Sequence, residues 1–309
     1  MTGAMLLAAL LDTAFGWPGA AVRRIGHPVV WMGTLIDGLR ARLNHGSAAR
    51  RRAMGALTVL LVTAAAALPA LLVQTALPDG ISGTVLTAVL AWPLVAIRAL
   101  RDHVAAVAVP LGRGDLPAAR RAVAMIVGRD PERLDRAGVA RATIESLAEN
   151  ASDAVAAPLF WGALLGLPGI AAYKAVNTMD SMIGHRTPEL ADFGRAAARL
   201  DDLVNLLPAR ATGALVALVS PAPRAVFAAM RRDAPRHRSP NAGWPEAAMA
   251  AALGVRLSGP RAYAEGQADE PWLNAGAPDP GAADIDRALS LCRRALLVGL
   301  AALAAVALA

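Results

Sequence analysis

Acidic side chains lie on both sides of one long uncharged stretch, residues 154–173. A charged side chain within or beside membrane hydrocarbon is costly, so it is usually retained there for a function. Glu145, Glu149 and Asp153 precede the stretch at intervals of four residues. The polar residues that follow it include Lys174, Asn177, Asp180, Asp201 and Asp202. This pattern predicts the active site of an integral membrane enzyme.

The spacing of the first three carboxylates suits Mg²⁺, which prefers carboxylate and amide oxygens together with phosphate oxygens and water. On one helix the three would share a face. Glu149 and Asp153 would be about 6 Å apart along the helix axis and could share one ion, whereas Glu145 and Asp153 would be about 12 Å apart. The alternative is a solvated polar helix face at the membrane surface.

Several other polar residues are candidates for binding anions. Lys174 is the only lysine of the chain; it suits a phosphate or carboxylate oxygen, or it is a lysine that snorkels from the end of an apolar segment. His185, Arg186 and Asp192 follow Asp180 closely and are candidates for binding anionic substrate groups. The run SPNAGWPEAAMA (Ser239 to Ala250) places Asn241, Trp244 and Glu246 at a helix start, where backbone N–H groups favour anions. The same run is compatible with an ordinary cap and loop.

The composition indicates a membrane protein. Of the 309 residues 56% are hydrophobic and 18% charged, with a mean hydropathy of +0.43, against about 25% charged in soluble domains. Despite the net charge of +7, the 4% aromatic content and the absence of nucleic-acid-binding motifs exclude nucleic acid as the expected partner. The arginine clusters instead flank apolar segments, as in loops held against anionic lipid. The single Cys292 excludes an intramolecular disulfide and a cysteine-based metal site.

We expect an all-α, polytopic membrane protein, with cytoplasmic helices and loops around an active site at the membrane surface. Residues 55–78 and 81–97 are uncharged and long enough to span a membrane. Arginines outside both segments place their outer ends in the cytoplasm and the turn at residues 78–80 outside. Residues 98–153 are expected to form a basic cytoplasmic region, with a helix start at Asp130-Pro131.

The second half of the chain is expected to complete a single membrane-embedded domain, residues 1–309. Because Gly166 to Gly169 interrupt the uncharged stretch 154–173, we favour a hairpin there over a full crossing; the hairpin returns both polar clusters to one side. Residues 224–294 read as a polar cytoplasmic segment containing a helix, 245–253, closed by Gly254. An apolar helix, 295–309, ends the chain.

Five stretches, taken in order, resemble the adenosylcobinamide-phosphate synthase family of cobalamin biosynthesis, also called CobD/CbiB. They are DTAFGWP with GHPVVWMG, ESLAENASDAVAAPLF, YKAVNTMDSMIGH, DFGRAAARLDDLVNLLPAR and SPNAGWPEAAMA. The resemblance runs from about Asp12 to Pro260 and is much more specific than any single motif. The segment 261–309 matches weakly, and no residue role is transferred there.

The resemblance implies a ligase of the bacterial inner membrane whose active site faces the cytoplasm. Such an enzyme joins the propionate of adenosylcobyric acid to (R)-1-aminopropan-2-ol, or to its O-phosphate, as an amide, using ATP and Mg²⁺. Membrane lipid and these small molecules are then the expected partners, and a homo-oligomer is compatible with the sequence. The chain carries none of the common phosphate-loop signatures, so ATP would bind in another way.

The residue roles that follow are hypotheses. Catalytic roles are expected for Glu145, Glu149, Lys174, Asp201 and Asp202. Metal binding is expected for Glu149, Asp153 and Asp180. Binding of the nucleotide or of other anionic groups is expected for Asn150, Asn177, His185, Arg199 and Arg210. Substrate binding is expected for His27, Asn241, Trp244 and Glu246.

Two other functions fit parts of the pattern. An intramembrane prenyl or phosphoryl transferase would use Asn150-x-x-Asp153 and Asn177-x-x-Asp180 to hold Mg²⁺-diphosphate, but it has no need of the SPNAGWPEAAMA segment. A membrane sensor without enzymatic activity has no need to keep the acidic residues.

Overall fold

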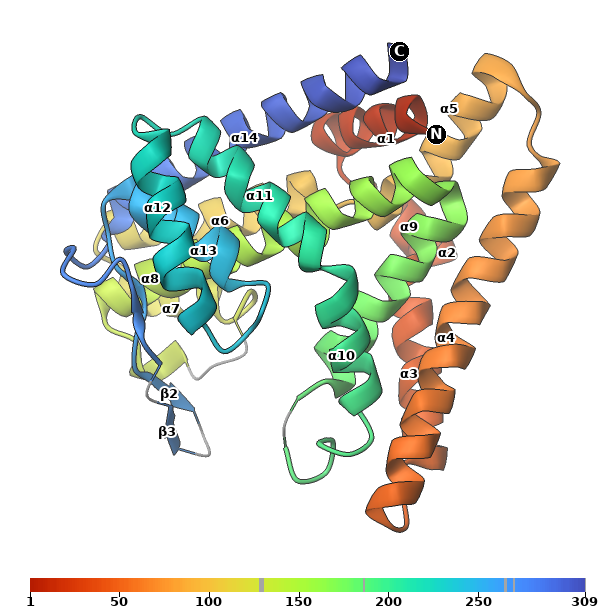
Figure 1. Cartoon of the computed structure of the whole chain (residues 1–309), viewed down its shortest axis with the longest axis horizontal. Helices are drawn as coiled ribbons and strands as arrows, with labels where there is room; N and C mark the ends of the chain where they lie inside the picture. The colour runs from red at the N-terminus through yellow and green to blue at the C-terminus, as the bar shows by residue number, and fades with distance from the viewer. Residues whose placement is uncertain (128–130, 186, 264–265, 269, 309) are drawn as a thin grey trace. The chain divides into compact units, whose positions relative to one another are not determined.

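The computed structural model describes residues 1–127, 131–185, 187–263, 266–268 and 270–308, and these are almost entirely helical (Figure 1). The all-α expectation is confirmed. Contacts divide the chain into two compact units: unit 1 comprises 1–97, 157–205 and 303–309, and unit 2 comprises 98–156 and 206–302. The expectation of a single membrane-embedded domain stays a prediction.

Unit 1 is built from helices at the start and in the middle of the chain. They are α1 (Thr2–Phe15), α2 (Gly19–Ile25), α3 (Pro28–Leu43), α4 (Ala48–Ala76), α5 (Gly80–Ala91), the 3₁₀ turn η1 (Trp92–Leu94), α9 (Ala157–Ile183) and α10 (Arg195–Val204). Helix α9 contacts α1, α3, α4, α5 and α10. Its second half contributes Val176, Met179 and Ile183 to a core completed by Ile36 and Phe193. This helix therefore organises unit 1.

Unit 2 contains the remaining helices and four short strands. They are α6 (Ile97–Gly112), α7 (Leu116–Val123), η2 (Pro131–Arg133), α8 (Arg136–Asn150), the π-helical segment η3 (Ala151–Ala156), α11 (Leu206–Leu218), α12 (Pro223–Asp233), η4 (Ala234–Arg236), α13 (Gly243–Leu253), β1 (Leu257–Ser258), β2 (Arg261–Tyr263), β3 (Gly266–Ala268), β4 (Trp272–Leu273) and α14 (Ala282–Leu308), whose last residues belong to unit 1. Strand β1 pairs antiparallel with β4, and β2 with β3. Helix α13 contacts α8, α11 and α12, and its Ala248 and Met249 are fully buried in the core of this unit.

Within the part of the chain that the structure describes, four helical runs are long and apolar enough to cross a membrane: Ala48–Ala76, Gly80–Gly112, Arg136–Ile183 and Ala282–Leu308. The first covers the predicted span 55–78 up to Ala76, and leucines such as Leu60 and Leu72 are exposed along it, as lipid-facing residues are. The second contains the predicted span 81–97, but that span is not one regular helix. Pro93 lacks the N–H that a continuing helix needs, and α5 gives way to η1 there.

The predicted break in residues 154–173 is confirmed at Gly166, whose φ of 70° and ψ of −150° interrupt α9. The freed N–H of Leu167 donates to the side-chain oxygen of Gln74 at 2.7 Å, which satisfies a backbone group that lipid cannot. Trp161 before the break donates to the carbonyl of Val204 (3.1 Å), and Tyr173 after it donates to the neighbouring Asn205 (2.9 Å). The two arms of α9 therefore bend back towards the same part of α10, and the bend is visible in Figure 1.

Three helix boundaries differ from the expectation. The long helix of the basic region begins at Arg136, where the Asp135 side chain accepts from the N–H of Gly138 (2.6 Å). Pro131 starts only a 3₁₀ turn, and Asp130 lies outside the described residues. The last helix begins at Ala282 rather than 295, because Asp284 accepts from the N–H of Gly281 and caps a polar first turn. By contrast, the helix predicted for 245–253 is confirmed in α13, and Gly254 closes it with a φ of 72°.

Candidate active site

In unit 1 a chain of polar contacts connects α9 with α10. The ammonium of Lys174 donates to Asn177 Oδ1 (3.4 Å), and the Asn177 side chain interacts with the carboxyl group of Asp201. On its other side, Asp201 Oδ2 accepts from Asn205 Nδ2 (3.0 Å), and Asn205 Oδ1 accepts from Tyr173 Oη (2.9 Å). We call these five residues the Lys174–Asp201 network. It places a cation, two amides and a buried carboxyl group in one cluster.

Helical spacing explains how the sequence builds this network. Lys174 and Asn177 are three residues apart on α9, and Asp201 and Asn205 are four apart at the end of α10, so each pair shares a helix face. The loop between the two helices is anchored by Asp192, which accepts from Arg51 at 2.9 Å and from Arg52 at 2.8 Å. The acidic end of α10 is therefore held close to the second arm of α9.

The electrostatics of this region favour a bound cation and a shared proton. Burial, followed by the nearby charge of Asp180, raises the pKa of Asp201 to about 7, although hydrogen bonds from the two asparagines oppose the shift. The carboxylate of Asp180 interacts with the charges of Asp202 and His185. Carboxylates this close together repel one another, and a divalent cation would relieve that repulsion.

His27 stands beside the same network. Its Nδ1 accepts from the N–H of Val29 (3.2 Å), so the side chain caps α3. Burial, followed by the positive charge of Lys174, lowers its pKa, which favours the neutral imidazole. The predicted substrate residue His27 therefore lies within electrostatic range of the predicted catalytic residue Lys174.

Unit 1 thus brings together seven of the predicted site residues: His27, Lys174, Asn177, Asp180, His185, Asp201 and Asp202. Arg199 lies on the same helix as Asp201 but its side chain is exposed. Arg186 lies outside the described residues. Asp192, expected among the anion-binding residues, instead bonds two arginines.

In unit 2 the three evenly spaced acidic residues have different surroundings. Glu145 is 4% exposed, and its Oε1 accepts from the N–H of Ser258 at 2.7 Å. Glu149 is exposed, and Asp153 is partly exposed on η3. The regular α-helix expected through all three residues ends at Asn150, where the π-helical segment begins; such segments are frequent at functional sites. Asn150 donates its amide back to the carbonyl of Ser146 (2.9 Å).

The remaining candidates of unit 2 lie on α11 and around the start of α13. The guanidinium of Arg210 stacks over the Trp244 ring, 4.6 Å from its centroid, and also donates to the carbonyl of Leu206 (2.8 Å). Asn241 and Glu246 are almost fully buried. Helix α11 contacts both η3, which carries Asp153, and α13. Arg210 and Trp244 therefore form a fixed cationic and aromatic surface.

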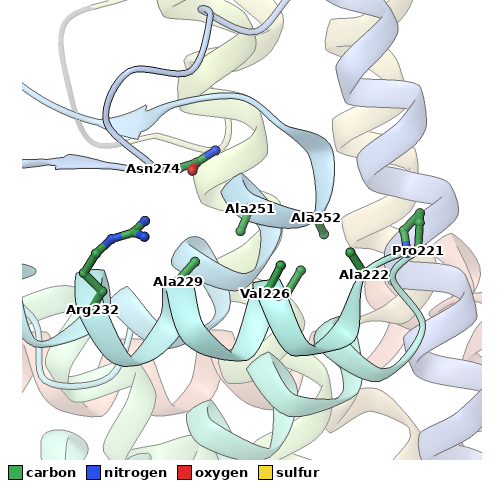
Figure 2. Close-up of a pocket in the computed structure, with 9 residues that line it drawn as sticks. Pro221, Ala222, Val226, Ala229, Arg232, Ala251, Ala252 and Asn274 are labelled. Carbon is green, nitrogen blue, oxygen red and sulfur yellow. The ribbon is translucent and has the colours of Figure 1, made fainter.

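A groove of about 300 Å³ in unit 2 contains none of the predicted site residues (Figure 2). Small side chains of α12 and α13, including Ala229 and Ala251, face each other across it. Its one charged residue, Arg232, already donates to Asp233 at 2.8 Å. This groove offers little chemistry.

The donor chemistry of unit 1 fits Mg²⁺ bound together with a nucleotide. Among the described residues no three His, Cys, Asp or Glu side chains are close enough to hold a metal ion by themselves. Mg²⁺ in phosphoryl-transfer sites usually takes one or two carboxylates and completes its shell with phosphates and water. Asp180 and Asp202, with the Asn177 amide beside them, meet that requirement. The predicted metal residues Glu149 and Asp153 belong to unit 2.

Three residues of these clusters were not predicted from the sequence. Tyr173 and Asn205 complete the Lys174–Asp201 network, and the spacing of Asn205 four residues after Asp201 was the available signal. His237 Nδ1 accepts from the N–H of Ser239 (3.1 Å), and its Nε2 lies 3.6 Å from Glu246 Oε2, with both side chains buried. Nothing in the local sequence distinguishes this histidine from a surface residue.

The comparison with known proteins decides the family. The model of the CobD/CbiB protein family matches residues 5–292. The chain belongs to the CobD/CbiB family. Among curated relatives, a cobalamin biosynthesis protein CobD of Rhodobacter capsulatus is 58% identical over 96% of both chains. Proteins of the same name from Brucella anthropi and Rhizobium meliloti are 48% and 45% identical, over 92% and 98% of this chain and 90% and 96% of their own. No solved structure matches the chain.

Proposed function

We propose that this CobD/CbiB protein is an enzyme of cobalamin biosynthesis that joins the propionate of adenosylcobyric acid to (R)-1-aminopropan-2-ol, or to its O-phosphate, with hydrolysis of ATP. Family membership and the names of the relatives support the role in cobalamin biosynthesis. The observation that supports the chemistry is the Lys174–Asp201 network, which joins a cation, amide donors and a carboxyl group of raised pKa beside two further carboxylates.

A carboxylate is a poor acyl donor, so amide formation requires its activation. We propose that the propionate attacks the γ-phosphate of ATP, giving an acyl phosphate and ADP. The amine then attacks the acyl carbon, phosphate leaves, and the proton lost from nitrogen passes to a base. Lys174 would hold phosphate oxygens, because a compact ammonium suits them. Asp201, whose pKa is about 7, is the proposed proton acceptor.

Mg²⁺ would screen the phosphate charges when bound. In unit 1 we assign it to Asp180 and Asp202 beside Asn177. In unit 2 the exposed Glu149 and the partly exposed Asp153 offer a second pair of carboxylates for another Mg²⁺ ion, with Asn150 next to them. His185 interacts with Asp180 and would adjust the charge of the first pair.

Unit 2 would supply contacts to the corrinoid. The Arg210 guanidinium lies over the Trp244 ring, and a guanidinium held in place is well suited to a carboxylate such as a propionate. Asn241 and Glu246, buried at the start of α13, would support this surface and the peripheral amides of the ring. Glu145 would be a positioning residue, because its carboxylate fixes the backbone of Ser258 at a φ of 61°.

The four apolar helical runs fit a membrane protein. We propose the bacterial inner membrane, with the active site on the cytoplasmic side, where ATP is available. Arginines next to the apolar runs, including Arg50 to Arg52 and Arg98, are consistent with this orientation.

Corrinoid-dependent ATP hydrolysis by the purified protein tests the proposal. Wild-type protein in detergent should hydrolyse ATP when adenosylcobyric acid and the amine are both present with Mg²⁺. Asp180→Asn and Asp202→Asn should lower this rate at least a hundredfold. Ser181→Ala removes a hydroxyl that donates to the backbone carbonyl of Asn177 on the same helix (2.9 Å), and this variant should retain most of the rate. Corrinoid-independent hydrolysis by the wild type, or wild-type rates in the two aspartate variants, would refute the proposal.

A further inference from the structure

Four aromatic side chains of unit 1 form a cluster that has no role in the reaction proposed above. Trp17 lies 5.6 Å from Trp92 and 6.0 Å from His27 between ring centroids, nearly perpendicular to both, and Phe15 lies 6.2 Å from Trp92. Gly16 has φ 57° and ψ −171°, a conformation that only glycine adopts readily, and it turns the chain between Phe15 and Trp17. We call Phe15, Trp17, His27 and Trp92 the aromatic cluster.

The aromatic cluster adjoins the Lys174–Asp201 network. His27 belongs to the cluster and interacts with the charge of Lys174. From Lys174, helix α9 continues for six residues to Asp180, about 9 Å along its axis. Unit 1 therefore presents aromatic rings, then an ammonium, then carboxylates, in that order. Adenine, triphosphate and Mg²⁺ follow the same order in a metal-bound nucleotide.

The indole N–H groups of the aromatic cluster independently indicate that a ligand binds there. Nε1 of Trp17 and Nε1 of Trp92 are both buried and have no hydrogen-bond acceptor among the described residues. Buried polar groups are rarely left without a partner, so each such group needs an explanation. Tryptophans of a membrane-interface belt turn their polar edge to water and headgroups, whereas these two N–H groups face inward. The ring nitrogens of a purine are suitable acceptors, and both indole rings remain partly exposed.

We propose that the aromatic cluster binds the adenine ring of ATP, with Trp17 as its main contact and with the phosphates extending past Lys174 to the carboxylates of Asp180 and Asp202. The assignment rests on the proposed function, because it names the nucleotide subsite of that reaction. It also explains how the chain recognises a nucleotide without a phosphate-loop motif.

Comparison of ATP with inorganic tripolyphosphate separates the base subsite from the phosphate subsite. The full-length protein in detergent is titrated with each ligand in the presence of Mg²⁺ by calorimetry. Wild type should bind ATP more tightly than tripolyphosphate. Trp17→Leu should weaken ATP about tenfold, within the range for loss of one base-stacking ring, and leave tripolyphosphate within twofold. Trp92→Phe, which keeps a ring but removes the N–H, should weaken ATP less.

Two controls make the outcome decisive. Phe160→Leu removes another partly exposed ring of unit 1, one that contacts Trp161, and should change neither affinity. Unchanged tripolyphosphate binding by Trp17→Leu shows that this variant is folded. If Trp17→Leu is misfolded, Trp92→Phe is compared with the wild type instead. Equal losses for both ligands, or no loss for ATP, would overturn the base subsite alone. A wild type that binds neither ligand would refute the proposed function, and the base subsite with it.

Discussion

The pKa of Asp201 is strongly altered by its surroundings. Its pKa of about 7 in the folded protein is far above the value of about 4 expected in an unfolded chain. Between those values the folded state holds a proton that the unfolded state has lost. The free energy of unfolding therefore has a contribution from Asp201 that is complete below pH 4 and is lost as the pH rises towards 7.

Asp201→Asn should remove that pH dependence. Thermal unfolding in detergent should show the wild type losing stability from pH 5 to pH 7.5, and the variant losing clearly less. Asp192→Asn is the matched control of opposite sign, because bonds from Arg52 and Arg51 lower the pKa of Asp192. As the pH rises from acidic values, the wild type should gain stability from the ionised Asp192, and the variant should lack this gain. An unchanged profile for Asp201→Asn would contradict the buried, protonated carboxyl group.

Glu145 is expected to stabilise the fold rather than to contact a substrate. Its buried carboxylate accepts the N–H of Ser258, and an amide oxygen would do the same. Glu145→Gln should therefore remain folded and retain most activity. Glu145→Leu should lower the free energy of unfolding by about 1–3 kcal/mol, the cost of a buried donor without a partner. Unfolding by heat and corrinoid-dependent ATP hydrolysis measure both variants; a folded but inactive Glu145→Gln would show a direct catalytic role.

The break in α9 is the element that places the candidate site of unit 1. Gly166 has a φ of 70°, and a Cβ there would overlap the Gln74 amide. Gly254 has a similar φ of 72°, but a Cβ there would meet nothing within 4 Å. Gly254→Ala should therefore cost only the backbone strain of about 1–2 kcal/mol. Gly166→Ala should cost clearly more, seen as a lower melting temperature in detergent, and should also weaken activity. Equal effects of the two substitutions would show that the Gln74 contact contributes nothing.

At the level of secondary-structure elements, the lengths of the uncharged stretches and the positions of glycine and proline predicted most of the fold. The span in α4, the turn before α5, the break at Gly166 and the helix closed by Gly254 were all predictable, because each depends on local chemistry. The π-helical segment after Asn150 was not, since its residues are ordinary helix formers. Nor was the start of α14, where the cap is formed by Asp284, a residue of the segment predicted to be polar and cytoplasmic.

Many residues of the candidate site could be predicted from the sequence, but most of the contacts that they make could not. The structure places Lys174, Asn177 and Asp201 in one network, whereas their roles stay predictions. The different surroundings of Glu145 and Glu149 could not be foreseen, because the Ser258 backbone that binds Glu145 is more than a hundred residues away. Long-range partners of this kind leave no local signal in a single sequence.

For the whole molecule, we assign nucleotide chemistry to unit 1 and corrinoid contacts to unit 2. Each unit is nearly all helical and has its own buried core. The apolar runs would hold both units at the membrane. Because of this division, a substitution can change the binding of one ligand without changing that of the other. Arg210→Ala should weaken corrinoid binding while leaving the affinity for Mg²⁺-ATP unchanged.

The most direct test of the account is detection of the product by mass spectrometry. Purified full-length protein is incubated with adenosylcobyric acid, Mg²⁺, ATP and either (R)-1-aminopropan-2-ol or its O-phosphate. The account predicts a new corrinoid whose mass is that of the acid plus the amine minus water, formed with one equivalent of ADP and absent when ATP is omitted. Unchanged adenosylcobyric acid with both amines, under conditions where the protein is folded and binds Mg²⁺-ATP, would contradict it.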